Sequence, residues 1–330
     1  MKEPHRSKNY LLGIDTGTSK THAMLSTCSG EVMGFGESGC GNYEVVGFDG
    51  FKDAMREATE QALNMAGINK AQILSMGLGI SGYDWPSEAP LMTAAIQTLA
   101  IECDYRFEND VTIGLIAGSS EGWGVAVDAG TGNNVRGRDP EGRIGRITGN
   151  SVYYGEIGGG GEMVWLAQIA VTHAWSLRGP KTRLTQAFMD FAEVESEFEL
   201  IEGLATEQIH LPPILAEEIF RLAAQGDLVA GEIITTSAHE IGLNVNAVIK
   251  QLDLQQRSFD LVLIGSIFKA GEPYLNPFRQ TVNGFAPGAN LIWLSVPPVV
   301  GAVLLAAEVV RIPLHEIRGT LIDSASRFLI

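Results

Sequence analysis

LLGIDTGTSKTHAML, residues 11–25, consists of two short apolar runs separated by a tight polar connection. The first run ends at Asp15, and the second resumes at His22. Two such runs around a glycine-containing connection are typical of a β-hairpin. The connecting residues 16–19, TGTS, add hydroxyl groups to the backbone N–H donors of the turn. A turn of this kind can bind an anion or can be an ordinary polar turn, and this stretch alone leaves both interpretations open.

A second strand–turn–strand pattern of the same kind follows about a third of the chain later. WGVAVDAGTGNNVRG, residues 123–137, again places an aspartate and a Gly/Thr turn after an apolar run. Asp15 and Asp128 both begin a D-x-G-T sequence, and they lie 113 positions apart (128 − 15). Because both the pattern and its structural context repeat, the sequence predicts two related halves.

The hydrophobic periodicity predicts the same order of elements in each half. The first half is expected to contain strands at 10–15, 21–27 and 30–38, a helix at 47–67, a strand at 73–81, a helix at 87–102, a strand at 105–110 and a short helix at 112–120. The second half continues after its hairpin with a strand at 143–147, a helix after the glycine run 158–161, a mostly helical insert from about 180 to 255, a strand at 259–266, a helix at 272–283, a strand at 290–295 and a last helix at 298–312.

This order predicts an α/β protein of two similar domains, residues 1–120 and 121–330, with the helical insert in the second. The two domains should face one another across a cleft and present one D-x-G-T turn each to it. The last helix is expected to be able to pack on the N-terminal domain.

Composition excludes several classes of function. The chain is 45% hydrophobic and 19% charged, as in ordinary globular proteins, and its net charge is −16 without a basic block. We therefore expect no nucleic-acid partner, because a phosphate-backbone surface needs clustered Lys and Arg. The three cysteines form no C-x-x-C pair, which argues against a disulfide framework or a zinc site. The start lacks a signal-peptide segment, and no apolar run reaches about 18 residues, so we expect a cytoplasmic protein without a membrane partner.

Two facing Gly/Thr turns suit a polyphosphate, since N–H groups and hydroxyls can surround it without net positive charge. Asp15, at the base of the first turn, could hold Mg²⁺ through its water shell.

Three other motifs are rejected. GLGISG, residues 77–82, has the spacing of a dinucleotide site, but its glycines lie within and at the end of a strand and no helix follows. GIDTGTSKT nearly matches a P-loop, but Thr18 occupies the position of its second glycine and a strand follows. HEIGL, with His239 and Glu240, lacks the second histidine of a zinc motif.

Three loops contain candidate site residues. Asp110 ends an apolar strand before a helix, at the edge where α/β sheets place ligands, and it could equally be a helix N-cap. Asn42 and Tyr43 in GCGNYEVVG could contact a sugar, as could Glu156 in GNSVYYGEIGGGGE. Taken singly, each of the last two segments can also be read as a plain loop.

Together these segments resemble the N-acetylglucosamine kinase and archaeal hexokinase branch of the BadF/BadG/BcrA/BcrD activator-ATPase family, within the actin-like ATPase superfamily. Six segments carry the resemblance in order along nearly the whole chain: GIDTGTSKT, SGCGNYEVVG, GLGISGYD, ENDVTIG, VDAGTGNN and LVLIGSIFKAG. Each motif alone is degenerate, but the ordered set is specific.

The resemblance implies two RNase H-like domains, each a mixed sheet with flanking helices, that use ATP and Mg²⁺ to phosphorylate a sugar. It assigns the catalytic base to Asp110. It assigns ATP to Asp15, Gly17, Thr18, Ser19, Lys20, Gly130, Thr131, Gly132, Asn133, Gly265, Ser266 and Ala270. It assigns the sugar to Asn42, Tyr43, Asp84, Asn109, Asp110, Gly149, Asn150, Ser151 and Glu156.

The sequence also departs from the family pattern. Thr18 and Ser19 replace a more glycine-rich first turn, and Glu156 replaces a shorter aspartate. We expect an ATP-dependent kinase that acts on the 6-hydroxyl of N-acetylglucosamine or a related hexose or hexosamine, and we expect a homodimer. The alternative is an activator ATPase that acts on a protein partner. Such a protein needs a surface cysteine for a shared iron–sulfur cluster, whereas all three cysteines fall in or beside predicted strands.

Overall fold

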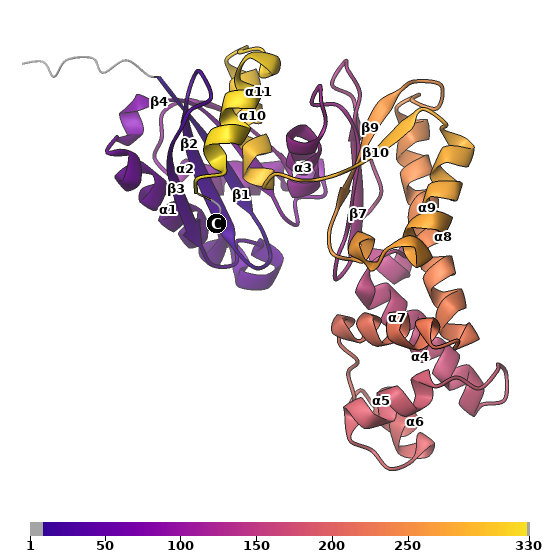
Figure 1. Cartoon of the computed structure of the whole chain (residues 1–330). Coiled ribbons are helices and arrows are strands. Elements are labelled where there is room, and N and C mark those ends of the chain that lie inside the picture. The colour runs from indigo at the N-terminus through magenta and orange to yellow at the C-terminus, as the bar shows by residue number, and fades with distance from the viewer. Residues whose placement is uncertain (1–8, 329–330) are drawn as a thin grey trace, which may run out of the picture.

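The computed structural model describes residues 9–328 as two α/β halves, each built on a five-stranded sheet (Figure 1). The expectation about a signal peptide rests partly on residues 1–8, which lie outside the described part. Within the described part, no helix is both long and apolar enough to cross a membrane.

The first sheet has the strand order β3-β2-β1-β4-β5. Its strands are β1 (Tyr10–Thr16), β2 (Thr21–Thr27), β3 (Val32–Ser38), β4 (Ile73–Ile80) and β5 (Asp104–Asn109). The first three strands form antiparallel pairs, whereas β4 and β5 run parallel to β1. Asp15 pairs with His22 across the first turn, which confirms the predicted hairpin.

The second sheet repeats this topology with the order β8-β7-β6-β9-β10. Its strands are β6 (Gly124–Ala129), β7 (Asn133–Arg138), β8 (Ile144–Arg146), β9 (Phe259–Ile264) and β10 (Ala289–Trp293). The hairpin of β6 and β7 is antiparallel, and β9 and β10 run parallel to β6. The repeated D-x-G-T pattern therefore marks equivalent hairpins in two mixed sheets, as predicted.

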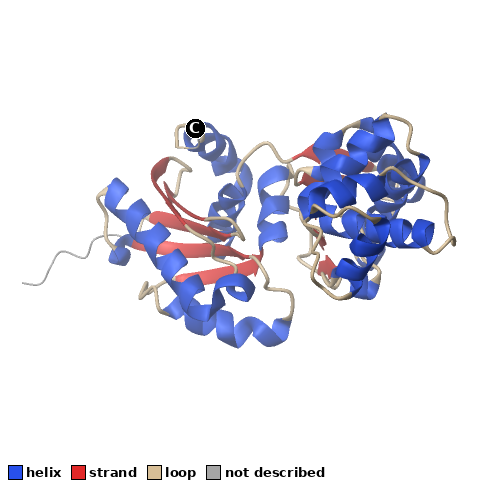
Figure 2. Cartoon of the chain, turned by 90° about the horizontal axis from the view of Figure 1, so that it is seen from below, coloured by secondary structure: helices blue, strands red, loops and turns tan. Residues whose placement is uncertain are grey.

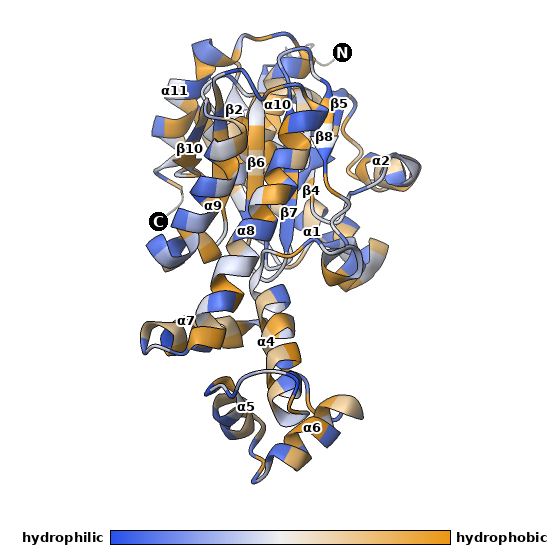
Figure 3. Cartoon of the chain, turned by 90° about the vertical axis from the view of Figure 1, so that its right-hand side faces the viewer, coloured by the Kyte–Doolittle hydropathy of each residue, from blue (hydrophilic) through white to orange (hydrophobic). Residues whose placement is uncertain are grey.

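Helices cover both sheets (Figure 2). They are α1 (Tyr43–Ala66), α2 (Ala89–Gln97), α3 (Asp110–Gly118), α4 (Gly160–Trp175), α5 (Leu184–Ala192), α6 (Glu197–Ala205), α7 (Ala216–Ala224), α8 (Leu228–Gln251), α9 (Glu272–Phe285), α10 (Pro298–Val309) and α11 (Leu314–Ala325). Five short 3₁₀ turns join them, η1 (Lys70–Gln72), η2 (Pro86–Glu88), η3 (Ser151–Tyr154), η4 (Pro213–Leu215) and η5 (Ile267–Ala270). Helices α5 and α6 project away from both sheets (Figure 1 and Figure 3).

Three helix predictions need correction. α1 begins at Tyr43 rather than at residue 47, because Asn42 caps it and the chain continues through a kink at Gly47. α2 is shorter than predicted, since a 3₁₀ turn precedes it and its last turn ends at Gln97. α11 was not predicted, yet Ile317, Leu321 and Ala325 are spaced four residues apart and are buried beside α10.

The last long helix returns to the first sheet, although it belongs to the second half by sequence. A Cβ on Gly13 would lie 2.5 Å from the backbone nitrogen of Val303, and one on Gly77 would lie 2.1 Å from the carbonyl oxygen of Ala302. Only glycine allows β1 and β4 to approach α10 so closely. The glycine at position 77 therefore serves helix packing rather than a dinucleotide.

Helix α3 lies between the two halves (Figure 1). Val111 and Leu115 pack with Ala126 and Val262 of the second sheet. Ile113 on the other side of the helix is buried with α10. The first residue of α3, Asp110, is therefore placed at the boundary of the two halves.

Candidate functional site

A cavity of about 360 Å³ lies where the first turn, the start of α3 and the end of β6 meet. Asp15 and Asp128 come from the equivalent hairpins, and Asp110 comes from the start of α3. The cavity is lined by Asp15, Gly17, Thr18, Ser19, Lys20, His22, Asp110, Val111, Asp128, Ile264 and Pro298. The two halves thus bring three carboxylates from distant parts of the sequence to one space.

The first turn is held by its own backbone. The Gly17 N–H donates to the Lys20 carbonyl at 3.0 Å, and its carbonyl accepts from the Gly41 N–H at 2.9 Å. Thr18 and Ser19 are exposed at the tip, and Lys20 forms a 3.3 Å ion pair with Glu37. Because both partners of that pair are more than half exposed, water screens it and the Lys20 ammonium can exchange it for a phosphate.

The second turn is fastened to the first turn of helix α4. The Gly160 N–H donates to the Gly130 carbonyl at 2.8 Å, and the Gly161 N–H donates to the Thr131 carbonyl at 2.7 Å. Asn133, assigned to ATP by resemblance, instead donates through Nδ2 to the Glu156 carbonyl at 2.8 Å. Its side chain therefore connects the second turn with the loop that was assigned to the sugar.

The carboxylates of the cavity are electrostatically unfavourable in the absence of a cation. Burial, with a contribution from Asp110, raises the pKa of Asp15 to about 8, and Lys20 opposes this shift. Burial and Asp110 likewise raise the pKa of Asp128 to about 7. A divalent cation near these oxygens would favour their ionised forms.

This donor set fits Mg²⁺, which prefers carboxylate and water oxygens. Among residues 9–328, no three His, Cys, Asp or Glu side chains form a group that could hold a metal directly. The arrangement therefore suits an ion that keeps much of its water shell, with Asp15 and Asp128 on two sides of the cavity.

The segment assigned to adenosine lies directly beside the second hairpin. Gly265 has φ = +99°, and a Cβ there would lie 2.2 Å from the Ala129 carbonyl oxygen and 2.7 Å from Asp128 Oδ1. Gly265 and Ser266 are exposed next to this contact, and Ala270 ends the short helical turn η5 that follows. β9 thus places the adenosine segment against the base of the second turn.

Asn42 connects the first turn with Ser81, the residue after β4 whose hydroxyl hydrogen-bonds Asp110. Its Oδ1 accepts from the Glu44 N–H at 2.9 Å and so caps α1. Its Nδ2 donates to the Thr18 hydroxyl at 3.4 Å and to the Ser81 hydroxyl at 3.3 Å. The hydroxyl of the neighbouring Tyr43 donates to the Gly82 carbonyl at 2.7 Å.

Asn42→Asp should separate the capping role from the donor role. Aspartate caps a helix about as well as asparagine, so the melting temperature should change little. The substitution removes the hydrogen bonds from Nδ2 to Thr18 and Ser81, which hold Ser81 beside Asp110, so it should weaken sugar binding roughly 10-fold, equivalent to about one hydrogen bond. The affinity for an ATP analogue should change less, because the contact with Thr18 is long. Thermal melting and titration with each ligand would measure these effects.

Asn42→Ala is the matched variant, since it removes the cap as well and should also lower the melting temperature. If Asn42→Asp weakens nucleotide binding and leaves sugar binding intact, the assignment of Asn42 to the sugar rather than to the nucleotide is wrong.

The candidate base Asp110 is the first residue of α3, and the N-cap is its neighbour Asn109. Asn109 Oδ1 accepts from the Val111 N–H at 3.0 Å. The interpretation of Asp110 as the N-cap is therefore wrong.

Burial raises the pKa of Asp110. Hydrogen bonds from the Ser81 hydroxyl and the Val111 N–H oppose this rise in the pKa, and Asp84 reinforces it.

Asp84 is paired with protein donors from both halves. Its Oδ1 accepts from the Arg136 guanidinium, from Asn109 Nδ2 at 3.3 Å and from Asn134 Nδ2 at 3.5 Å. Its Oδ2 would lie 3.3 Å from a Cβ on Gly149, whose φ is +79°. Glycine at this position permits the positive φ and keeps a side chain away from Asp84 Oδ2.

The longer carboxylate of Glu156 reaches back to its own loop. Its oxygens accept from the Thr148 N–H at 2.7 Å, the Thr148 hydroxyl at 2.9 Å and the Asn150 N–H at 3.0 Å. Asn150 Nδ2 donates to the Thr148 carbonyl, and Ser151 donates to the buried Glu162. In this arrangement Glu156 shapes the loop that carries Gly149 and Asn150.

Several residues of the site were not selected from the sequence. Asp128 was recognised as the counterpart of Asp15 but was given no role, although that equivalence was a sufficient signal. Ser81 and Arg136 had no such signal, since nothing in a strand end or in NNVRGR identifies a partner on the other half.

Two mixed sheets of the same topology, with an aspartate from the equivalent hairpin of each at one cavity, define the actin-like ATPase class. The chain belongs to the BadF/BadG/BcrA/BcrD ATPase family, which it matches over residues 12–306.

Two curated relatives agree with this assignment, and a solved structure agrees with the fold. The chain is 27% identical over 299 residues to the N-acetylmuramic acid/N-acetylglucosamine kinase of Clostridium acetobutylicum, covering 90% of this chain and 98% of that protein. It is 27% identical over 313 residues to the N-acetyl-D-glucosamine kinase of Dictyostelium discoideum, covering 91% and 98%. The fold matches the ROK hexokinase of Thermus thermophilus with a TM-score of 0.56 at 16% identity, covering 92% of this chain and 99% of that one.

Proposed function

We propose that this protein is an ATP-dependent sugar kinase that transfers the γ-phosphoryl group to the 6-hydroxyl of N-acetylglucosamine or a related hexose or hexosamine. The observation that carries this proposal is the cavity in which Asp110 meets the two aspartate-based turns. A base, a phosphate-binding turn and a cation-binding carboxylate are the parts that phosphoryl transfer requires in one place.

The residues that line the cavity and those around it have separate tasks in this proposal. The first turn, through Thr18, Ser19 and Lys20, and the second turn, through residues 130–132, bind the phosphates of ATP. The exposed Gly265 and Ser266 receive the adenosine. Bound Mg²⁺ would neutralise charge on the triphosphate, with Asp15 and Asp128 as the carboxylates that face it. Catalysis then depends mainly on position and charge.

Asp110 is the group that accepts the proton of the attacking hydroxyl. It lies at the helix N-terminus of α3, where its ionised form is favoured, and Arg136 contributes positive charge nearby. The hydrogen bond from Ser81 helps to fix the carboxylate. Burial opposes ionisation, so the carboxylate remains a stronger proton acceptor than an exposed aspartate.

The sugar would bind between the Asn42 side and the loop of Gly149, Asn150 and Glu156. The two kinases named above act on N-acetylated amino sugars, which supports the same substrate class here. The proposal includes a homodimer and a cytoplasmic location.

Sugar-dependent release of ADP tests this function. The protein is incubated with ATP and Mg²⁺, and ADP is measured with N-acetylglucosamine, N-acetylmuramic acid, glucose or no sugar. We expect rapid ADP formation only with a sugar, together with a phosphorylated sugar in mass spectrometry. Steady hydrolysis that is indifferent to every sugar would instead support the activator ATPase alternative.

A further inference from the structure

Strand β7 presents a row of polar side chains to the N-terminal half. Alternate residues of a strand face the same side, so Asn134, Arg136 and Arg138 share one face. Val135 and Gly137 face the opposite side, where Val135 is in the core and a Cβ on Gly137 would contact Val248 and Leu252. The polar face of β7 therefore lies at the boundary of the two halves.

The two arginines of this face form separate ion pairs with the N-terminal half. Arg136 pairs with Asp84, which follows β4, and its side chain is 4% exposed. Arg138 pairs with Glu308 of α10 at 2.7 Å, and its side chain is 8% exposed. A buried guanidinium needs such a partner, so both pairs fix β7 against the N-terminal half.

Only the first pair is connected to the candidate site. Asp84 Oδ1, which accepts from Arg136, also accepts from Asn109 Nδ2 at 3.3 Å. Asn109 uses its other side-chain atom, Oδ1, to cap α3. A continuous series of contacts thus runs from Arg136 through Asp84 and Asn109 to the first turn of α3.

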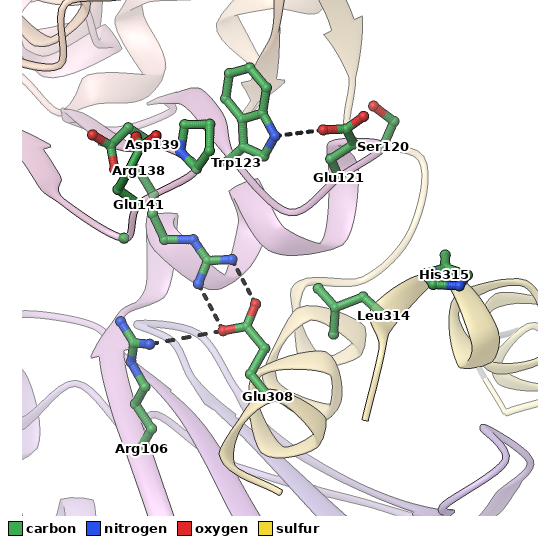
Figure 4. A pocket seen from close by; sticks show the side chains of 12 residues that line it. Arg106, Ser120, Glu121, Trp123, Arg138, Asp139, Glu141, Glu308, Leu314 and His315 are labelled. Atoms are coloured by element: carbon green, nitrogen blue, oxygen red, sulfur yellow. Dashed lines mark hydrogen bonds and ion pairs between the residues drawn. The ribbon is translucent and has the colours of Figure 1, made fainter. Parts of the chain in front are cut away.

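A second arginine holds the same loop. Arg146 of β8 donates to the Asp84 carbonyl, and its guanidinium carbon lies 4.5 Å from the centre of the Trp85 ring. Two cations from the C-terminal half therefore converge on residues 84–85. By contrast, Arg106 of β5, the cation beside the Arg138–Glu308 pair, belongs to the N-terminal half itself (Figure 4).

We infer that Arg136 is a positioning residue for phosphoryl transfer: it reaches across from the C-terminal half and, through Asp84 and Asn109, fixes the start of α3, where Asp110 lies. This inference rests on the proposed function. On this inference, Asp110 is in position to accept a proton only while Arg136 of the C-terminal half is paired with Asp84. Arg136 itself need not contact the substrate.

Arg138 provides a matched control for this inference. It lies two residues further along the same strand, is also buried, and also bridges the two halves. Its pair lines a different cavity of about 600 Å³ that includes Trp123, Leu314 and His315 (Figure 4). Arg138→Met and Arg136→Met each remove one buried interdomain ion pair, but only the second reaches α3.

The test combines two readouts. Hydrogen exchange of residues 109–113 reports the start of α3 without any substrate, and kinetics report turnover. In Arg136→Met we expect faster exchange in this segment and a kcat with N-acetylglucosamine that is at least roughly 10-fold lower, since small misplacements of a reacting group are costly. The affinity for an ATP analogue should stay within about 3-fold, which is less than one hydrogen bond.

In Arg138→Met, exchange at the start of α3 and kcat should stay near the wild-type values, although the melting temperature falls.

A double variant guards against simple unfolding. Asp84→Asn/Arg136→Met removes both charges of the pair, and residues 109–113 should exchange no faster in it than in the worse single variant if both residues act through one link. Equal exchange of residues 109–113 in both Met variants, or fully additive increases of that exchange in the double variant, would overturn the inference. A wild-type protein that phosphorylates no sugar would refute the proposed function instead, while the exchange measurement would still decide the link to α3.

Discussion

Asp110→Asn should lower kcat for sugar phosphorylation at least roughly 100-fold. General base catalysis is typically worth about 10²–10⁴-fold, and the loose transition state of phosphoryl transfer places the effect near the lower end of that range. Asparagine keeps the size and the hydrogen-bond acceptor but cannot take up the proton. The measurement is kcat with saturating ATP and sugar, together with the melting temperature.

The fold should tolerate this substitution. The N-cap of α3 is Asn109, so the cap remains in place. Burial raises the pKa of Asp110, which means that the folded protein disfavours the ionised carboxylate. A neutral amide avoids that cost at neutral pH, and the melting temperature should be unchanged or slightly higher.

Asn109→Ala is the comparison that separates the roles of the two residues. It removes the cap and should reduce the free energy of unfolding by about 0.5–2 kcal/mol. An Asp110→Asn protein with full activity would leave Asp110 a structural residue, and the proposed kinase would then lack its base.

Gly265→Ala should disrupt the nucleotide side of the cavity. The added methyl group would lie 2.2 Å from the Ala129 carbonyl oxygen, so β9 or the second hairpin would have to move. Overpacking of this kind costs about 1–3 kcal/mol, and a positive φ adds about 1–2 kcal/mol for alanine. Since Asp128 Oδ1 lies beside the same position, binding of an ATP analogue should weaken at least roughly 10-fold, equivalent to 1.4 kcal/mol.

Gly67→Ala is the control for backbone conformation alone. Gly67 also has a positive φ, +65°, but a Cβ there would meet nothing within 4 Å, and it ends α1 far from the cavity. It should lower stability by only about 1–2 kcal/mol and leave nucleotide binding unchanged. If Gly265→Ala loses stability but binds the ATP analogue as tightly as the wild type, the contact between Gly265 and Ala129 has no part in the nucleotide site.

Local patterns were sufficient for the hairpins, the order of strands and the family. The apolar runs around Asp15 and Asp128 predict strands because alternate side chains must be buried, and the Gly/Thr turns follow from conformations available to a few neighbouring residues. The ends of helices were less certain. α1 begins four residues earlier than the periodicity indicates, since its first turn depends on a cap by Asn42 rather than on apolar spacing.

Local sequence patterns are enough to predict two similar α/β halves with one D-x-G-T hairpin in each, because these features arise from interactions within short segments. Three features come from the folded protein: Asp110 meets Asp15 and Asp128 in one cavity, Asn109 rather than Asp110 caps α3, and Arg136 pairs with Asp84. These outcomes depend on which buried charges and apolar faces meet when the halves dock. Local sequence patterns do not predict these pairings, because the partners lie far apart in the sequence. Packing and the cost of leaving a buried charge unpaired select them.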